Sequence, residues 1–399
     1  MIETEILIIG GGIAGTSTAY HLAQHGRQVA LLERGNIASE ASGVNAGSIG
    51  AIGWGNLPNL ESYLTMGSLE IFKAMQIELG YDIEFRRSGC LQAVQTEAEY
   101  AYIQRRITTL RSQGYTVDLL TVGEAQAIEP HINPRLLACV HIPLRAQADP
   151  RKATQAFATA AAEHGARILV NHDVKAVRLH GEGSYEIETS RDVCRTRTLV
   201  IAAGAWCGQI GRLIGVHIPI TPVRGQMWAS APLPPRIFQT ISAAESSLQW
   251  FTAPGNDGEH PPYLTHRQGT RVTRHLYGRQ TREGEIIFGG DRQVVGFDKV
   301  PDPAGIEVNH GHAAEVLPFL EEVPITRTWA GFMPFPLDGT PIIGKIPQRP
   351  NLYIVSGLAS SGFGRGPMAG RLLADYIHTG HRPHVLAEAD PARCVAAME

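Results

Sequence analysis

The order of apolar and polar residues at the start of the chain predicts a strand, a helix and a second strand. Ile6–Ile9 is a short apolar run of strand length, and a cluster of glycines follows it. Residues 16–24 then place apolar side chains at helical spacing, and Gly26 provides a helix stop signal. A second apolar run, Val29–Leu32, completes a strand–turn–helix–strand unit.

The glycines between the first strand and the helix have the spacing G-x-G-x-x-G, at Gly10, Gly12 and Gly15. The first makes a tight turn, the second lets the backbone approach a pyrophosphate, and the third lets the helix pack closely on the strand. Free N–H groups at the start of the helix favour the same anion. Glu33 follows the second strand, where it can accept hydrogen bonds from a ribose diol and would repel the 2′-phosphate of NADP. This unit therefore predicts a dinucleotide site, for NAD or for FAD.

Three further segments combine small residues with apolar runs. Residues 40–53, EASGVNAGSIGAIG, would let main chain pass close to a flat ring, or would form a surface loop. Residues 198–208, TLVIAAGAWCG, indicate a strand that leads into a second close backbone approach, or a buried strand that ends in a glycine turn. Residues 352–377 indicate a strand, a glycine-rich loop and a helix, with Pro367 near the first turn of that helix.

Capping and turn signals predict further elements. Asp149 is the expected N-cap of a helix with Pro150 at its first position, and Gly165 ends that helix. Residues 271–280 and 285–294 predict two strands of one hairpin.

The segment WAGFMPFPLDGTPIIG, residues 329–344, is of a different kind. Its three prolines exclude a regular helix, and they make it too broken for a central strand.

Composition restricts the class of protein. The 399 residues suggest about two domains. The net charge of −3, with acids and bases interspersed, gives no sign of a nucleic-acid surface. The five cysteines are scattered without a Cys-x-x-Cys pair, so neither a disulfide framework nor a metal site is predicted. No segment has about 18 uninterrupted apolar residues, and we expect no membrane span and a cytoplasmic location.

Taken together, these segments resemble the FAD-dependent D-amino-acid oxidase superfamily, in its glycine oxidase, sarcosine oxidase and amine dehydrogenase branch. The resemblance spans nearly the whole chain. It includes GFMPFPLDGTPIIG at 331–344, where relatives carry a GLRPxTPDGxPIIG-like motif, and TPVRGQM at 221–227. LYGRQTREGEIIFGGDR, at 276–292, is most similar to the sarcosine and proline dehydrogenase β-subunits. The resemblance implies FAD as the cofactor and oxidation of a carbon–nitrogen bond next to an amine.

The resemblance also implies the architecture, an α/β fold that is α+β overall. We expect a discontinuous Rossmann-like FAD-binding domain and a smaller substrate domain made of an antiparallel β-sheet plus helices. The predicted FAD-binding domain comprises residues 1–85, 147–222 and 326–399. The predicted substrate-binding domain comprises residues 86–146 and 223–325.

The cofactor contacts follow from the matched motifs. Ser42 and Asn45 could bond to phosphate or to the edge of the ring, Val174 corresponds to a backbone contact to adenine, and Asp338 and Ile343 would lie near the ribityl chain. The whole predicted set is Gly10, Gly12, Ile13, Ala14, Gly15, Glu33, Arg34, Ala41, Ser42, Asn45, Ala46, Gly47, Ser48, Val174, Ala203, Gly204, Trp206, Gly331, Asp338, Ile343, Gly362, Phe363, Gly364 and Arg365. Covalent relatives attach the flavin through a Cys near the TPDG-like motif or a His near the N-terminal loop. Residues 332–338 hold no Cys and residues 39–53 no His, so we expect noncovalent FAD.

In such a flavoenzyme hydride passes from the substrate to flavin N5. The helix near Pro367 is a candidate to stabilise the resulting negative charge, with Arg365 close by. No general base is needed if the amine binds neutral. We therefore assign none, and since the chain has 16 histidines we expect His266 and His275 to be structural or solvated.

Met333 departs from the family pattern. The glycine oxidase branch has at this position an Arg that pairs with the substrate carboxylate, which Met cannot do. Either another basic residue holds the carboxylate, or the substrate lacks one and Met333 forms an apolar wall. The basic candidates are Arg224, Arg279 and Arg274, with Arg365 as a substitute from the C-terminal glycine loop. The predicted substrate-pocket set is Arg365, Met333, Tyr277, Arg279 and Arg224.

Two other functions fit the same resemblance. One is an FAD-dependent 2-hydroxy-acid or polyol dehydrogenase, which would need a base for the hydroxyl proton. The other is a flavin-carrying β-subunit whose chemistry needs a partner chain. The expected partners are a small-molecule amine or amino acid and oxygen or another electron acceptor. A homo-oligomer or a partner subunit is compatible with the sequence.

Overall fold

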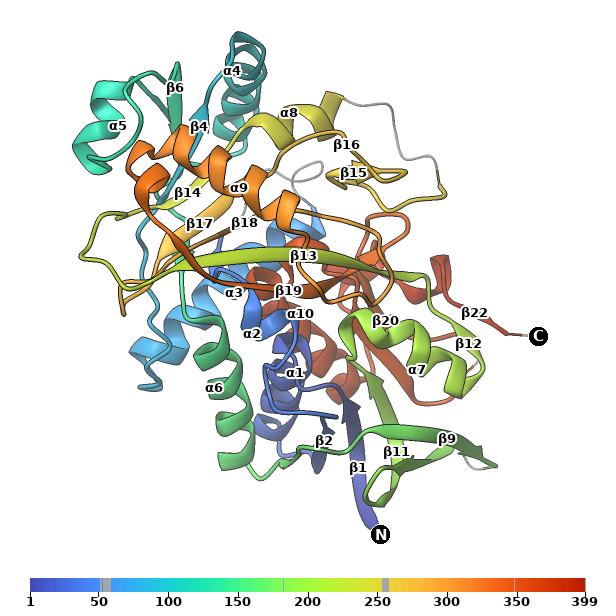
Figure 1. The fold of residues 1–399 in the computed structure, drawn as a ribbon. Helices are drawn as coiled ribbons and strands as arrows, with labels where there is room; N and C mark the ends of the chain where they lie inside the picture. Colours follow the sequence, from blue (N-terminus) through green and yellow to red (C-terminus); the bar gives the residue numbers. More distant parts are fainter. Residues whose placement is uncertain (51, 53–58, 182, 253–257, 348, 399) are drawn as a thin grey trace.

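The computed structural model describes residues 1–50, 52, 59–181, 183–252, 258–347 and 349–398. Ala51 and Gly53, at the end of the predicted small-residue segment 40–53, lie outside the described residues. Two large sheets organise the chain, and Figure 1 shows β13 (Ile220–Ser230) and β19 (Ile325–Pro336), two long strands of the second sheet, crossing the middle of the molecule. The mixed α/β architecture that the sequence predicts is confirmed.

The first sheet is mostly parallel, in the order β20-β21-β11-β1-β2-β8. Its strands are β1 (Ile2–Ile9), β2 (Val29–Leu32), β8 (Arg167–Leu169), β11 (Val193–Ile201), β20 (Ile342–Lys345) and β21 (Leu352–Ser356). Only β20 runs antiparallel to its neighbour on this path. A hairpin, β9 (Val174–His180) and β10 (Ser184–Thr189), joins the sheet through β11. The inner strands are nearly continuous apolar runs because helices or the hairpin cover both faces.

One face of the first sheet packs against a layer of helices. They are α1 (Ile13–Gln24), α3 (Leu60–Ile77), α6 (Pro150–Glu163) and α10 (Gly362–Thr379). The predicted caps of α6 are confirmed, since the Asp149 side chain accepts a hydrogen bond from Lys152 N and Gly165 follows at a φ of +92°. On the other face α7 (Cys207–Ile214) contacts β9.

The start of α10 differs from the prediction. The helix begins at Gly362, so Pro367 lies inside it rather than in its first turn. Around this proline α10 packs closely on α1. A Cβ at Gly370 would lie 2.7 Å from Thr18 N, and the carbonyl of Pro367 accepts a hydrogen bond from Ser17 Oγ.

The second sheet is almost entirely antiparallel, in the order β19-β13-β18-β17-β14-β4-β6-β5. Its strands are β4 (Cys90–Val94), β5 (Asp118–Leu120), β6 (Ala138–His141), β13 (Ile220–Ser230), β14 (Thr240–Ala243), β17 (Tyr277–Gln280), β18 (Ile286–Gly289) and β19 (Ile325–Pro336). The predicted hairpin is confirmed, because β17 and β18 pair antiparallel around a turn that contains Gly284.

Helices cover both faces of the second sheet. The helix α4 (Glu97–Ser112) packs with one face, and α5 (Val122–Ile128) and α9 (Pro303–Val316) pack with the other. The helices α2 (Ala41–Val44) and α8 (Glu245–Thr252) lie beside the cavity described below. The remaining short strands are β3 (Ser48–Ile49), β7 (Ala146–Gln147), β12 (Val216–His217), β15 (His266–Arg267), β16 (Thr270–Arg271) and β22 (Ala396–Ala397).

The proline-rich segment 329–344 supplies most of β19, the edge strand of the second sheet. This position agrees with the expectation that the segment is neither a helix nor a central strand. Pro334 lies opposite Pro222 of β13, and the pairing continues through Pro336. Two facing prolines fit an antiparallel pair whose N atoms point away from each other.

The predicted domain boundaries stay a prediction, and two strands bear on them. Both β13 and β19 belong to the second sheet along their whole length, although the boundaries at 222 and 326 cut through them. The chain rejoins the first sheet only at β20.

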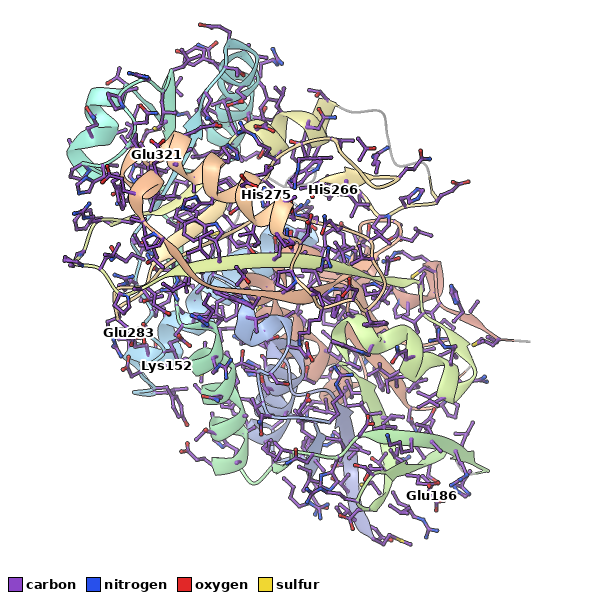
Figure 2. All side chains as sticks on the ribbon, in the orientation of Figure 1. Lys152, Glu186, His266, His275, Glu283 and Glu321 are labelled. Carbon is purple, nitrogen blue, oxygen red and sulfur yellow. The ribbon has the colours of Figure 1, made fainter. Side chains whose placement is uncertain are left out.

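Ion pairs connect the helix layer of the first sheet with the second sheet. Lys152 of α6 forms ion pairs with the buried Glu84, at 2.5 Å, and with Glu283 of the β17–β18 turn, at 3.9 Å. Figure 2 shows Lys152 and Glu283 at the same edge of the molecule. The α6 layer is thereby linked to the hairpin of the second sheet.

Within the described residues, no helix is both long and apolar enough to span a membrane. The same part of the chain holds no group of three side chains suited to a metal ion. All five cysteines have free thiols.

A buried carboxylate at the end of α5, beside the second sheet, predicts that the stability of the protein depends on pH. Glu129 has no exposed surface, it accepts hydrogen bonds from the backbone N–H groups of Phe238 and Gln239, and burial raises its pKa from 4.5 to about 7. The folded state therefore holds this proton more tightly than the unfolded state, so the free energy of unfolding should fall as pH rises from 4.5 to about 7. Glu129→Gln keeps an oxygen acceptor and should gain about 1–3 kcal/mol over wild type at pH 8.

Urea unfolding at pH 5 and pH 8 tests this prediction. The difference between the two proteins should shrink at pH 5. Parallel pH profiles would show that Glu129 does not titrate in this range.

Candidate active site

A cavity of about 660 Å³ lies between the two sheets. Its walls come from the glycine turn after β1, the end of β2, the start of β9, the segment after β11, the middle of β13 and β19, and the start of α10. Several of these are carboxyl ends of parallel strands, where open α/β sheets bind their ligands.

The predicted dinucleotide motif lines one end of the cavity, which we call the dinucleotide end. Gly10, Gly12, Ile13 and Ala14 line it, and Ser42 Oγ accepts a hydrogen bond of 2.9 Å from Ile13 N at the start of α1. This hydroxyl satisfies one of the donors at the helix N-terminus and leaves others for a ligand.

Two charged residues after β2 also face this end. The carboxylate of Glu33 is fixed by hydrogen bonds from Gly11 N and Gly35 N, each 2.8 Å long. The guanidinium of Arg34 lies over the ring of Trp206, with its carbon 3.9 Å from the ring centroid. Val174 lines the same end of the cavity.

The glycine motif has the geometry that its sequence predicts. Gly10 has a φ of +121°, which a side chain would strain. A Cβ at Gly15 would lie 2.0 Å from the Gly10 carbonyl oxygen, so only glycine lets α1 pack this closely on the end of β1.

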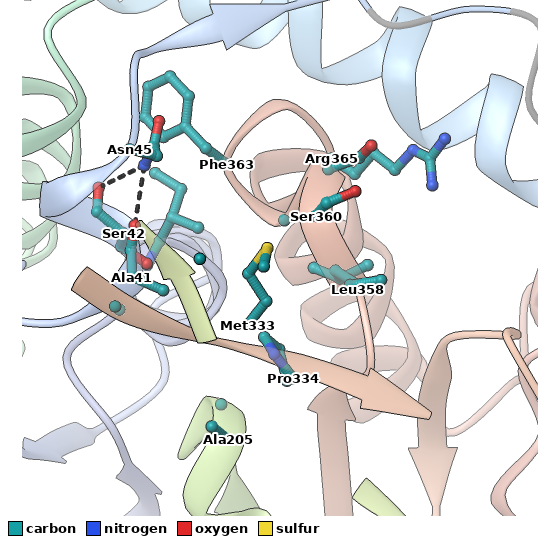
Figure 3. A pocket seen from close by; sticks show the side chains of 18 of the residues that line it. Ala41, Ser42, Asn45, Ala205, Met333, Pro334, Leu358, Ser360, Phe363 and Arg365 are labelled. Atoms are coloured by element: carbon teal, nitrogen blue, oxygen red, sulfur yellow. Dashed lines mark hydrogen bonds between the residues drawn. The ribbon is translucent and has the colours of Figure 1, made fainter. Parts of the chain in front are cut away.

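The first turn of α10 forms another wall. Gly362, Phe363, Gly364 and Arg365 all line the cavity. Figure 3 shows the guanidinium of Arg365 directed away from Met333, and its charge is paired with Glu61 at 2.7 Å. The positive charge of Arg365 in the cavity wall is therefore balanced by a carboxylate.

Met333 points from β19 into the space between α2 and the loop before α10 (Figure 3). Its methyl group would lie 2.9 Å from a Cβ at Gly225 on the neighbouring strand. Tyr277 of β17 lines the same part of the cavity, and burial raises the pKa of its phenol. Gly225 of β13 and Gly331 of β19 face each other and both line the cavity, so main chain without side chains forms this part of the wall.

Comparison with known proteins decides the family. A family model described as FAD dependent oxidoreductase (DAO) matches residues 5–376. The chain belongs to the DAO family of FAD-dependent oxidoreductases. Its cofactor is FAD.

The chain is 29% identical to glycine oxidase of Geobacillus kaustophilus (strain HTA426), over 94% of this chain and 92% of that protein. It is 26% identical to mitochondrial dimethylglycine dehydrogenase of Mus musculus, over 98% of this chain and 44% of that protein. The crystal structure of L-proline dehydrogenase from P. horikoshii superposes with a TM-score of 0.83, at 26% identity, over 98% of each chain. These relatives support the resemblance on which the sequence-based prediction rests.

The cavity fits the cofactor of this DAO-family chain. The glycine turn and the N-terminus of α1 are suited to a pyrophosphate, and Glu33 to a ribose diol. Across the cavity, a Cβ at Gly364 would lie 3.4 Å from the Ser48 carbonyl oxygen, so the α10 turn and the small-residue segment come close without side chains between them. Other predicted residues that line the cavity are Ala41, Asn45, Ser48, Ala203, Gly204 and Gly331.

Five of the predicted cofactor residues lie outside the cavity lining. Gly15 acts through packing, as described above. The Ala46 carbonyl accepts a hydrogen bond from Arg279, and a Cβ at Gly47 would lie 3.3 Å from the Arg279 guanidinium. Asp338 forms an ion pair with Arg393 at 2.8 Å, and Ile343 is buried within β20. Direct cofactor contacts of these five residues stay a prediction.

The basic residues predicted to hold a carboxylate are also placed elsewhere. Arg224 leaves β13 on the face opposite to Gly225, and its guanidinium donates to Gln293 and to the Val300 carbonyl. Arg279 donates to the Ala46 carbonyl at 2.5 Å and to Gln147, and Arg274 forms ion pairs with Glu245 and Glu315. We exclude all three from direct substrate contact, because their donors are committed outside the cavity.

The structure instead places Arg292 in the cavity wall, a residue that the sequence-based candidates missed. It is 3% exposed and follows β18 by three residues, within the quoted segment 276–292. Its guanidinium donates to the Tyr263 carbonyl at 3.1 Å and to His275 Nε2 at 3.2 Å, and lies 4.1 Å from the centroid of Trp250. Burial lowers the pKa of Arg292 to about 9, which leaves it a cation at neutral pH.

His275 lines the cavity next to Arg292 and is neutral. Burial, reinforced by the charge of Arg292, lowers its pKa well below the usual range. Since Nε2 accepts from Arg292, Nδ1 carries the proton and donates to Ser246 Oγ at 2.8 Å. The imidazole therefore orients the guanidinium without adding a second positive charge. His266 does not line the cavity.

Proposed function

We propose that this chain oxidises the C–N bond of an amino acid that carries a free carboxylate, and that Arg292 binds this carboxylate. The single observation that carries the proposal is the buried guanidinium of Arg292 in the wall of the cavity that Met333 also lines. Glycine, dimethylglycine and L-proline, named for the relatives, all carry a carboxylate.

Two neighbours fix the geometry of Arg292. The Tyr263 carbonyl and His275 Nε2 each accept from a different nitrogen of the guanidinium, so the plane of the group is set before a ligand arrives. Holding the donor in place reduces the entropy cost of forming a charge-assisted hydrogen bond. Met333 and Tyr277 then form the wall against which the rest of the substrate would lie.

The bound flavin supplies the two-electron acceptor. The N-terminus of α10 is directed at the cavity through Gly362–Gly364, and its dipole favours negative charge there. His275 is held neutral with its proton on Nδ1, and the charge of Arg365 is balanced by Glu61. We assign Arg292 to the substrate carboxylate on its position in the cavity wall, and we assign no general base.

Anaerobic reduction of the flavin, followed near 450 nm, tests the proposal with matched pairs. Glycine and methylamine, sarcosine and dimethylamine, and proline and pyrrolidine differ only in the carboxylate. We expect the amino acid of at least one pair to reduce the flavin about 100-fold more efficiently than its amine. Equal reduction by amines would overturn the carboxylate assignment, and reduction by a 2-hydroxy acid alone would favour the hydroxy-acid alternative.

The same preparation tests two accompanying proposals. Acid precipitation should leave the flavin in the supernatant, as noncovalent FAD requires. Gel filtration of the chain alone, combined with reduction by an amino acid, would show that the chemistry does not need a partner subunit.

A further inference from the structure

The cavity continues from Tyr277 across the second sheet, away from the dinucleotide end. Tyr277, Ser242, Gln92 and Val140 lie opposite one another on the successive strands β17, β14, β4 and β6. All four line the cavity. Since neighbouring strands lie about 4.8 Å apart, this row extends about 14 Å from the phenol. We call the part of the cavity along this row the side branch.

The helix α4 forms the roof of the side branch. Five residues of one helical face line it at spacings of three and four, which is the pattern of a single helix stripe. These residues are Tyr102, Ile103, Arg106, Ile107 and Leu110. Below them, Val140 and Ile142 line the sheet side, and both are at most 5% exposed. The walls are therefore mainly aliphatic.

Two arginines interrupt these apolar walls. Arg106 lies with its guanidinium carbon 5.3 Å from the centroid of Phe251, and Arg145 donates to Cys90 Sγ at 3.3 Å. Arg106 Nη2 and Arg145 Nε are buried and have no hydrogen-bond partner. Within the described residues neither side chain forms an ion pair, unlike Arg365, which pairs with Glu61.

The position of Arg145 links it to the row. Cys90 Sγ, which accepts from Arg145, lies 3.6 Å from Ser242 Oγ, and Ser242 is the neighbour of Tyr277 on the next strand. Arg145 therefore lies near the start of the side branch. Arg106, on α4, lies in the roof of the side branch. Buried guanidinium donors without acceptors are costly unless a ligand supplies the acceptors.

We propose that the side branch binds a second carboxylate of the substrate through Arg106 and Arg145. The substrate class is then an amino dicarboxylate, either an acidic amino acid or an N-carboxyalkyl amino acid, with methylene groups along the aliphatic walls between its two anions. This inference rests on the proposed function, because the first carboxylate is the one assigned to Arg292.

Ligand binding without turnover tests this inference separately from the reaction. Titration of the FAD-loaded protein with glutarate, adipate and pimelate, and with butyrate, pentanoate and hexanoate, can be followed as a perturbation of the flavin spectrum. We expect the best dicarboxylate to bind at least about 10-fold more tightly than the best monocarboxylate. This comparison needs no variant and so does not depend on how a mutant folds.

Arginine variants then locate the second site. Arg106→Gln and Arg145→Gln should each weaken dicarboxylate binding about 10-fold or more, with Arg106→Lys intermediate, while monocarboxylate binding changes less than about 3-fold for Arg106→Gln. Arg105→Gln is the matched control, because Arg105 is exposed on the same helix and does not line the cavity.

Dicarboxylates that bind no better than monocarboxylates would overturn the inference. So would Arg106→Gln and Arg145→Gln variants that keep wild-type dicarboxylate affinity. A protein that binds dicarboxylates tightly, but whose flavin no amino acid reduces, would contradict the proposed function and leave the second site standing.

Discussion

Replacement of Arg292 by methionine should lower kcat/KM for the amino-acid substrate about 100- to 1,000-fold, or about 3–4 kcal/mol. The loss has two sources. The variant removes a charge-assisted contact, and it leaves the substrate carboxylate buried beside Met333 without a cation. Steady-state kinetics with the best amino acid from the matched pairs would measure it. The corresponding amine should lose less than about 5-fold, because it never made the contact.

Two further variants separate substrate binding from a general effect on folding. Arg292→Lys keeps the charge but not the planar pair of donors, and it should recover only part of the loss. Arg267→Met removes an exposed arginine that does not line the cavity, and it should behave as wild type. If Arg292→Met slowed the amine as much as the amino acid, Arg292 would be a structural residue and the carboxylate assignment would fail.

Gly15→Ala should destabilise the FAD-loaded protein by about 3 kcal/mol and reduce its flavin content. The added methyl group would stand 2.0 Å from the Gly10 carbonyl oxygen and 3.2 Å from Ala202 Cβ, so α1 must move away from β1. That movement displaces the helix N-terminus on which the pyrophosphate contact depends. Thermal unfolding and the ratio of flavin to protein absorbance measure the two effects.

Gly311→Ala is the control for Gly15→Ala. Gly311 also lies inside a helix, α9, but a Cβ there would meet no atom within 4 Å. The control should therefore gain up to about 1 kcal/mol from helix propensity. If both variants behaved alike, close packing of α1 on β1 would not be what selects glycine at position 15.

Local signals predicted the elements whose geometry is set by a few adjacent residues. Asp149 with Pro150 defined the start of α6, because a cap and a fixed φ act within one turn. The need for glycine in the G-x-G-x-x-G turn was also predicted from the sequence, since Gly10 and Gly15 contact each other at the end of β1. The prolines of 329–344 likewise excluded a helix and a central strand, and the segment lies at a sheet edge.

The residue that we propose for the substrate carboxylate could not be chosen in the same way. Arg224 lies on a strand, and whether its side chain faces the cavity depends on a register shared with β19, more than 100 residues away. Arg292 lies beyond β18, where the chain turns beside His275, and a Cβ at Gly290 would collide with the His275 carbonyl. Its direction is therefore set by a long-range contact that no local pattern encodes.

The start of α10 is likewise set by long-range contacts that the local sequence does not reveal. Pro367 suggested a first turn, but the helix begins at Gly362 because its glycines can pack against α1 and the rim of the cavity. Tertiary packing here outweighs a local preference of proline. The consequence for the site is favourable, since the earlier start brings the helix N-terminus to the cavity.

The two prolines of β19 also bear on how the protein behaves at high concentration. Pro334 and Pro336 lie at alternate positions of an edge strand and lack the amide hydrogen that a further strand would use. A second molecule therefore finds two donors missing where it would have to extend the sheet, and strand addition at this edge is disfavoured. Pro334, which also lines the cavity, thus helps to protect this sheet edge against self-association.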